Sequence, residues 1–239
     1  MTITESYQEL VTNTTREFVL QKPINRNRKT LENKWRASEI LRSRLSILAA
    51  LEDHQQLDRN FILSITDDDE LLFAASLIWG YGTHPRYRNI MDALETGYTT
   101  PEGSPTSLAV AVLNDAREKL RGNDVEEAFR CFYNGLDGRR NTTRIKGMRT
   151  PFITKILYFL GQQEGCDPQP LIFDLKVARN LDALARAGSA PMELAGLLKP
   201  QTISFQNYLE YCNWANAVKH HGQIIDPTVV EYALFSART

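Results

Sequence analysis

Residues 150–161 predict a helix that is apolar over most of its circumference. Thr150 is expected to cap this helix, Pro151 suits its first position because a missing N–H needs no partner there, and Gly161 is expected to end it. Its apolar residues are Phe152, Ile153, Ile156, Leu157, Phe159 and Leu160. A helix of this kind has to be buried, so Lys155 stands out as a charged residue within a predicted core.

Lys155 and Asp174 are the two residues that most suggest chemistry. Burial disfavours the charged form of a lysine, and a neutral amine is a nucleophile. Asp174 follows 19 positions later (174 − 155) and precedes an amphipathic run, which predicts that it caps a second helix. Each also has an ordinary interpretation, in which the lysine extends its head to water and the aspartate is only a cap.

The order of these residues resembles a known family. Lys146-Gly147, then Phe152-Ile153-Thr154-Lys155, then Phe173-Asp174 together resemble the helix-hairpin-helix DNA glycosylases of the 8-oxoguanine type, closest to their divergent bacterial and archaeal branch. The similarity covers about the middle third of the chain. It implies two helical lobes with an active cleft between them, and a helix-hairpin-helix element at about residues 139–187.

The resemblance also implies a reaction and assigns residues to it. Lys155 would attack C1′ of a flipped, modified nucleotide in double-stranded DNA, with 8-oxoguanine as the expected base, and Asp174 would stabilise positive charge on the sugar. The lysine Schiff base would then allow strand cleavage, so the activity expected is a DNA glycosylase with AP lyase activity. One departure affects DNA contact: the family's hairpin glycines, two and four residues before the lysine, are here Ile153 and Pro151.

Positive charge is concentrated just before the proposed nucleophile, although the whole chain has a net charge of −1. Residues 139–155 contain six basic residues and no acidic one. The predicted DNA-binding residues are Arg139, Arg140, Arg144, Lys146, Gly147 and Arg149. Lys146 and Arg149 are also expected to oppose protonation of Lys155 by repulsion between like charges. A second basic run occupies residues 22–44.

Base recognition requires an aromatic or apolar surface beside the flipped base. The candidates for this role are Tyr158, Tyr211 and Trp214. Helical cores use most aromatic side chains, so the packing interpretation competes with the functional one at each position.

The rest of the chain predicts an all-α fold and a single domain over residues 1–239. No long alternating strand pattern is present, and helices are expected at residues 31–52, 66–79, 85–97, 104–122, 124–133, 204–218 and 226–235. Residues 61–63 fit either a short strand or an apolar connection. No apolar run is long enough for a membrane span. The N-terminal residues lack the basic start and apolar core of a signal peptide, so a cytoplasmic protein is expected.

The three cysteines, Cys131, Cys166 and Cys212, are widely spaced and form no CxxC motif. Their spacing argues against a zinc knuckle, a disulfide framework and a four-cysteine iron–sulfur cluster. No metal and no cofactor are therefore expected.

Three alternatives to 8-oxoguanine repair remain open. A glycosylase of this type could remove a hypermodified phage base in anti-phage defence. The chain could also be a catalytically inactive helix-hairpin-helix module that only binds DNA, which the missing glycines and the modest net charge allow. A helical interaction protein without a nucleic-acid role is the third, and the acid-free basic segment counts against it.

Overall fold

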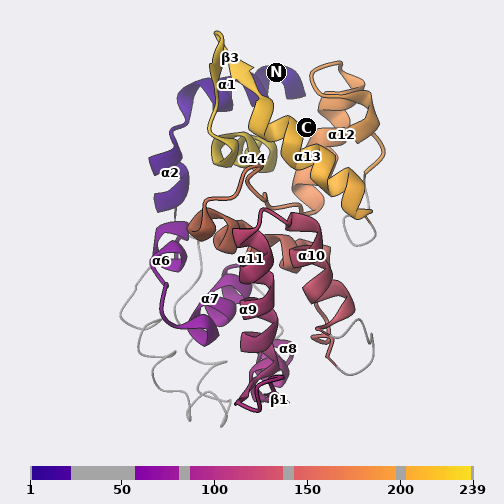
Figure 1. The fold of residues 1–239 in the computed structure, drawn as a ribbon. Coiled ribbons are helices and arrows are strands. Elements are labelled where there is room, and N and C mark those ends of the chain that lie inside the picture. Colours follow the sequence, from indigo (N-terminus) through magenta and orange to yellow (C-terminus); the bar gives the residue numbers. More distant parts are fainter. Residues whose placement is uncertain (1, 23–56, 81–86, 137–142, 198–202, 238–239) are drawn as a thin grey trace.

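The computed structural model describes residues 2–22, 57–80, 87–136, 143–197 and 203–237. Within these ranges the protein is built almost entirely from helices, with two short antiparallel hairpins (Figure 1). The all-α prediction is confirmed. The division into two lobes with a cleft between them stays a prediction. The expected helix at residues 31–52 and most of the basic run at residues 22–44 lie outside the described residues.

The elements follow one another along the chain in a simple order. The α-helices are α1 (Ile3–Asn13), α2 (Arg16–Gln21), α6 (Arg59–Leu63), α7 (Asp69–Gly80), α8 (Tyr87–Glu95), α9 (Leu108–Arg121), α10 (Val125–Asn134), α11 (Thr150–Glu164), α12 (Leu175–Arg186), α13 (Phe205–Ala217) and α14 (Pro227–Ser236), with one 3-10 turn, η1 (Met192–Leu194). The hairpins are β1 (Gly97–Thr99) with β2 (Pro105–Ser107), and β3 (Lys219–His220) with β4 (Gln223–Ile224).

Helix starts coincide with side chains that accept hydrogen bonds from first-turn amides. Asp124 accepts from the Glu127 amide, Asp174 from two amides of α12, and Asp226 from the Thr228 amide, as the sequence predicts for these three helices. The predicted start of a helix at residue 104 is wrong, because residues 105–107 pair as β2 and Ser107 then caps α9. Residues 61–63, expected as a strand or connection, belong to helix α6.

Helix α11 differs from the prediction at both ends. Its N-cap is Arg149 rather than Thr150, and no side chain caps it. It also continues past Gly161 to Glu164 and ends at Gly165, which has the left-handed conformation with φ of +69°. Gly161 serves packing instead: a Cβ there would lie 2.6 Å from Cδ of Pro170, so only glycine lets the following segment approach the helix this closely.

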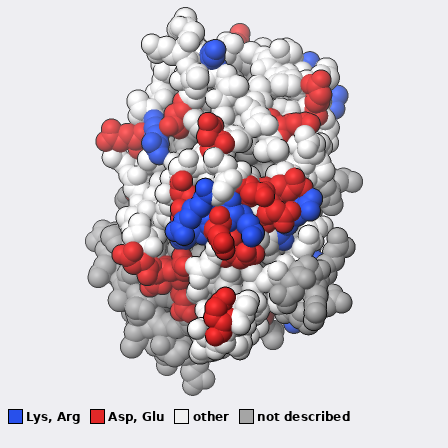
Figure 2. All heavy atoms as spheres, in the orientation of Figure 1, with Lys and Arg blue, Asp and Glu red and all other residues white. Residues whose placement is uncertain are grey.

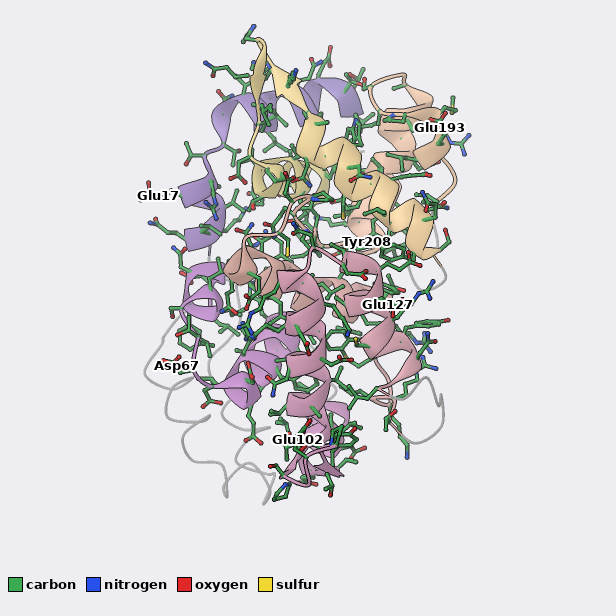
Figure 3. All side chains as sticks on the ribbon, viewed as in Figure 1. Glu17, Asp67, Glu102, Glu127, Glu193 and Tyr208 are labelled. Atoms are coloured by element: carbon green, nitrogen blue, oxygen red, sulfur yellow. The ribbon has the colours of Figure 1, made fainter. Side chains whose placement is uncertain are left out.

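One apolar core joins nearly all of the described helices. Helices from the two chain ends, α1, α13 and α14, gather at one end of the molecule, and α7, α8 and α9 lie at the other (Figure 1). Helix α11 packs against α6, α7, α9 and α10, which explains its nearly complete burial. In Figure 3 Tyr208 of α13 lies in the interior, where its ring is 5.8 Å from that of Phe129 on α10.

Candidate active site

Lys155 lies in the second turn of α11 with only 7% of its side chain exposed. Helical side chains point back towards the N-terminus, and here the Nζ atom donates a hydrogen bond to the carbonyl of Pro151, one turn earlier, at 3.1 Å. The amine is 5.9 Å from the centre of the Phe152 ring. The lysine side chain therefore lies along its own helix and is almost fully buried.

Asp174 faces this amine from the start of α12. Its Oδ1 atom accepts hydrogen bonds from the amides of Lys176 (2.9 Å) and Val177 (3.1 Å). Its Oδ2 atom is 3.8 Å from the Nζ atom of Lys155, and the side chain is 20% exposed. One oxygen thus fixes the carboxylate to the helix, while the other faces the lysine and the side chain still reaches solvent.

The neighbours of these two residues hold the pair together. Thr154, next to Lys155, accepts a hydrogen bond through Oγ1 from the amide of Phe173, next to Asp174, at 3.1 Å. The hydroxyl of Tyr208 donates to the carbonyl of Leu171 at 2.9 Å, so α13 holds the same segment from its other side. These buried contacts satisfy the backbone between the two helices and fix the direction from which Asp174 enters the site.

Burial shifts the protonation of the Lys155 amine towards the neutral form. Desolvation lowers the pKa of Lys155, against the opposing effects of the carboxylates of Asp174 and Glu231, and the guanidinium of Arg59 lowers it further. From the sequence this repulsion was expected from Lys146 and Arg149. Among the described residues, the cation that lowers the pKa of Lys155 is Arg59.

Gly80, the last residue of α7, lies directly against the lysine side chain. A Cβ at this position would be 2.6 Å from Cδ of Lys155 and 3.3 Å from its Cε. We expect Gly80→Ala to push Lys155 away from Asp174 and to slow any reaction that uses the Lys155 amine by roughly 10- to 100-fold, since small misplacements of a reacting group are costly. Single-turnover kinetics and thermal unfolding measure the two effects separately. Gly97→Ala is the matched control, because a Cβ there meets nothing within 4 Å; an unchanged rate in Gly80→Ala would contradict the assignment.

The loop before α11 presents basic side chains and is anchored by apolar ones. Ile145 and Met148 are buried, whereas Arg144, Lys146 and Arg149 are exposed. Gly147 has a φ of +78° and occupies the third position of the turn from Ile145 to Met148, where a type II turn requires glycine. The loop therefore brings three of the predicted DNA-binding side chains outward together.

Of the three predicted DNA-binding arginines before Ile145, the structure describes Arg144. Arg139 and Arg140 lie outside the described residues. Arg144 stacks its guanidinium over the ring of Tyr133 at 5.3 Å, which keeps the charge exposed while the ring orders the side chain.

Charges elsewhere on the surface are mixed. Figure 2 shows acidic and basic side chains interspersed over the middle of one face, and ion pairs of this kind join Arg117 to Asp69 and Glu164 at 2.8 and 2.7 Å. Glu17 and Asp67 lie at the edge of the molecule in Figure 3. The described part of the face in Figure 2 therefore offers no uniformly positive surface to a phosphate backbone.

The three candidate base-recognition residues differ in their positions. Tyr158 and Tyr211 are both 0% exposed, and the Tyr211 hydroxyl donates to the carbonyl of Ile172. Both rings pack in the core, and their role in base recognition stays a prediction. Trp214 is half-buried and packs against the core from α13.

Two buried charged residues near Lys155 were missed by the sequence analysis. Arg59 of α6 and Glu231 of α14 form an ion pair, with Nη1 2.7 Å from Oε2. The signal for Glu231 was available, because it is a lone acid in an apolar helix, as Lys155 is a lone base. Arg59 had no such signal in its short helix.

The described residues contain neither a membrane-spanning helix nor a cluster of metal-binding side chains. Among the helices that the structure describes, none has the length and apolar content needed to cross a bilayer. Across the same residues, no group of three or more His, Cys, Asp or Glu side chains lies close enough together to hold a metal ion.

Comparison with known proteins gives one match, to a protein family. Residues 17–235 match the family described as "Putative 8-oxoguanine DNA glycosylase OGG-like protein". No curated protein and no solved structure is similar enough to count as a match. The family match spans most of the chain, including α11 and α12, and a family of DNA glycosylases implies DNA as the partner. The chain therefore belongs to the OGG-like family of DNA glycosylases.

Proposed function

We propose that the protein is a bifunctional DNA glycosylase and AP lyase in which Lys155 is the nucleophile and Asp174 the assisting carboxylate. The observation that carries this proposal is the 3.8 Å separation between the Lys155 amine and the Asp174 oxygen that no backbone amide engages. The lowered pKa of Lys155 supports it, because an attacking amine must be unprotonated.

The proposed reaction begins with a modified nucleotide rotated out of the duplex. The lone pair of the Lys155 amine forms a bond to C1′, and the bond between C1′ and the base breaks, so that the base leaves with the electron pair and takes up a proton. The carboxylate of Asp174 stabilises positive charge on the sugar as this bond breaks.

The second half of the reaction uses the same amine. The sugar ring opens to a Schiff base between C1′ and Nζ, with the proton of the nitrogen available for transfer through Asp174. Loss of a proton from C2′ then expels the 3′ phosphate and cuts the strand. Water finally hydrolyses the Schiff base and frees the lysine.

The reaction and its substrate are tested by one experiment with two readouts. The protein is incubated with borohydride and one of three substrates: a duplex containing 8-oxoguanine, a duplex containing an abasic site, or phage DNA that carries hypermodified bases. A covalent adduct with any of them supports the lysine chemistry, and the released base, identified by mass spectrometry, gives the substrate. DNA binding without a released base or an adduct would favour the inactive DNA-binding module.

The basic loop before α11 is proposed to contact the phosphate backbone. We expect the double variant Arg144→Gln/Lys146→Gln to weaken binding to every duplex sequence and to reduce the slope of log K against log [salt] by about 1.8, since each lost phosphate contact removes about 0.9. Fluorescence anisotropy at several salt concentrations measures this slope. Lys219→Gln, an exposed lysine of β3, is the control and should leave the slope unchanged. If the double variant and Lys219→Gln had the same slope, the basic loop before α11 would not be the surface that contacts the phosphates.

A further inference from the structure

The buried ion pair between Arg59 and Glu231 has no role in the reaction described so far. The two residues come from α6 and α14, which are far apart along the chain, and Glu231 has a side-chain exposure of only 1%. Their charged atoms, Nη1 and Oε2, are 2.7 Å apart. Burial raises the pKa of Glu231 even though Arg59 opposes this effect. The protein thus keeps a carboxylate where its charged form is disfavoured.

Stability alone is a weak reason to retain such a pair. Removing two charges from water costs several kcal/mol per ion, and well-packed apolar residues of similar volume are often as stable as a buried ion pair or more so. The pair is therefore expected to serve something near it that responds to charge.

The ion pair and Lys155 have neighbouring residues in common, and the charges of the pair act on the lysine. The guanidinium of Arg59 lies 4.9 Å from the ring of Tyr158, which is one turn after Lys155 on α11. It also lies 5.1 Å from the ring of Trp79, which precedes Gly80, the residue in contact with the lysine side chain. The buried ion pair thus contacts the same segments of α7 and α11 that hold the lysine side chain.

We propose that the Arg59–Glu231 ion pair is a positioning element of the Lys155–Asp174 site, which sets the electrostatic environment of the amine from the inside of the protein. The proposal rests on the function proposed above, in which Lys155 is the nucleophile. Arg59 repels an ammonium at this position, whereas Glu231 attracts it. With both present, their effects on the amine oppose each other.

Three charged groups, together with burial, therefore act on the protonation of Lys155. Asp174 faces it from α12, Glu231 from α14 and Arg59 from α6, while burial within α11 disfavours its charge. Both carboxylates raise the pKa of Lys155, and Arg59 lowers it. Removing the charge of Glu231 leaves Asp174 as the carboxylate that opposes Arg59 and burial, so the lysine should lose its proton at a lower pH.

Glu231→Gln tests this directly, without DNA. Protein labelled with ¹³C at lysine Cε is titrated by NMR, with the Lys155 signal assigned by its absence in Lys155→Gln. We expect the titration midpoint of Lys155 in Glu231→Gln to lie below that of the wild type, such that the ratio of neutral to charged amine at a given pH rises by about threefold or more. A midpoint at or above that of the wild type would overturn the proposal.

Glu231→Gln leaves a buried arginine without its partner and can fail to fold, so a second variant removes both charges. In Arg59→Gln/Glu231→Gln the midpoint should still fall, by less than in the single variant, because Glu231 acts on the amine more strongly than Arg59 does. If only the double variant folds, its Lys155 titration midpoint decides the question. A midpoint below that of the wild type supports the proposal, and an unchanged or raised midpoint overturns it. Glu126→Gln, at an exposed ion pair on α10, is the control and should leave the Lys155 midpoint unchanged.

The kinetic counterpart separates this inference from the proposed function. The rate of borohydride trapping on abasic DNA should reach its plateau at a lower pH in Glu231→Gln than in the wild type. A wild-type protein that forms no adduct would refute the lysine chemistry, whereas the NMR midpoints would still report whether the ion pair controls the amine. A variant that only lost stability would show a lower unfolding temperature with an unshifted midpoint.

Discussion

Lys155→Gln is expected to abolish the covalent adduct with DNA and to reduce strand cleavage by at least roughly 1000-fold, because glutamine has no amine to form the Schiff base. Single-turnover assays with borohydride measure both effects. Glutamine is one atom shorter than lysine but keeps a polar, uncharged end in this buried position, so the DNA affinity should stay within a few-fold of the wild type. The trapping rate of the wild type should rise with pH and level off below the ordinary pKa of lysine, since burial lowers the pKa of Lys155.

Lys176→Gln is the matched control for this prediction. Lys176 lies in the first turn of α12, beside Asp174, but it is exposed and its amine lies over the ring of Phe235 at 4.5 Å. This variant should still form the adduct. Trapping that persists in Lys155→Gln and disappears in Lys176→Gln would move the nucleophile to the second lysine.

Lys155→Gln should also change how stability depends on pH. Lys155 binds its proton less tightly in the folded protein than in the unfolded chain, so wild-type stability falls as the pH drops from the ordinary lysine pKa to the lowered one. The variant lacks this contribution and should be at least as stable as the wild type at neutral pH. Urea denaturation at several pH values measures the difference.

Asp174→Asn is expected to slow base release by roughly 100- to 1000-fold while leaving the fold intact. Asparagine caps a helix as well as aspartate does, so the amides of Lys176 and Val177 keep an acceptor. The negative charge beside the sugar is lost, and with it both the stabilisation of the developing cation and the proton transfer. The rate of base release and the unfolding temperature are measured on the same preparations.

Asp124→Asn provides the control for the cap alone. Asp124 accepts a hydrogen bond from the Glu127 amide at the start of α10, so this variant makes the same chemical change at another cap. Its rate should equal that of the wild type. A comparable loss of rate in both variants would show that Asp174 acts only through the stability of its helix.

Local signals predicted the two helices of the site. The apolar circumference of α11 and the run that follows Asp174 are visible within a dozen residues, and so is the cap itself. The family resemblance supplied the pairing of Lys155 with Asp174, and the structure brings their charged atoms to 3.8 Å. The contact that fixes this pairing, from the amide of Phe173 to Thr154, joins residues 19 positions apart and has no sequence signature.

Non-local packing explains what the sequence did not predict. Arg59 and Glu231 are 172 positions apart (231 − 59), and nothing in the sequence around either residue predicts that they pair. Gly161 looked like a helix end because glycine often ends helices, yet the approach of Pro170 requires it in the helix interior. The hydrogen bond of the Tyr211 hydroxyl was not predicted because its acceptor, the carbonyl of Ile172, belongs to a segment distant along the chain.

The bonding of the Asp174 carboxylate has a consequence for repeated turnover. Two amides hold one of its oxygens, so in the proposed reaction we expect the side chain to keep its place when the amine moves away from Pro151 to attack a sugar. After the proposed Schiff base is hydrolysed, the released amine would then return to an unchanged counterion. We expect the site to regain its starting geometry without rearranging its backbone.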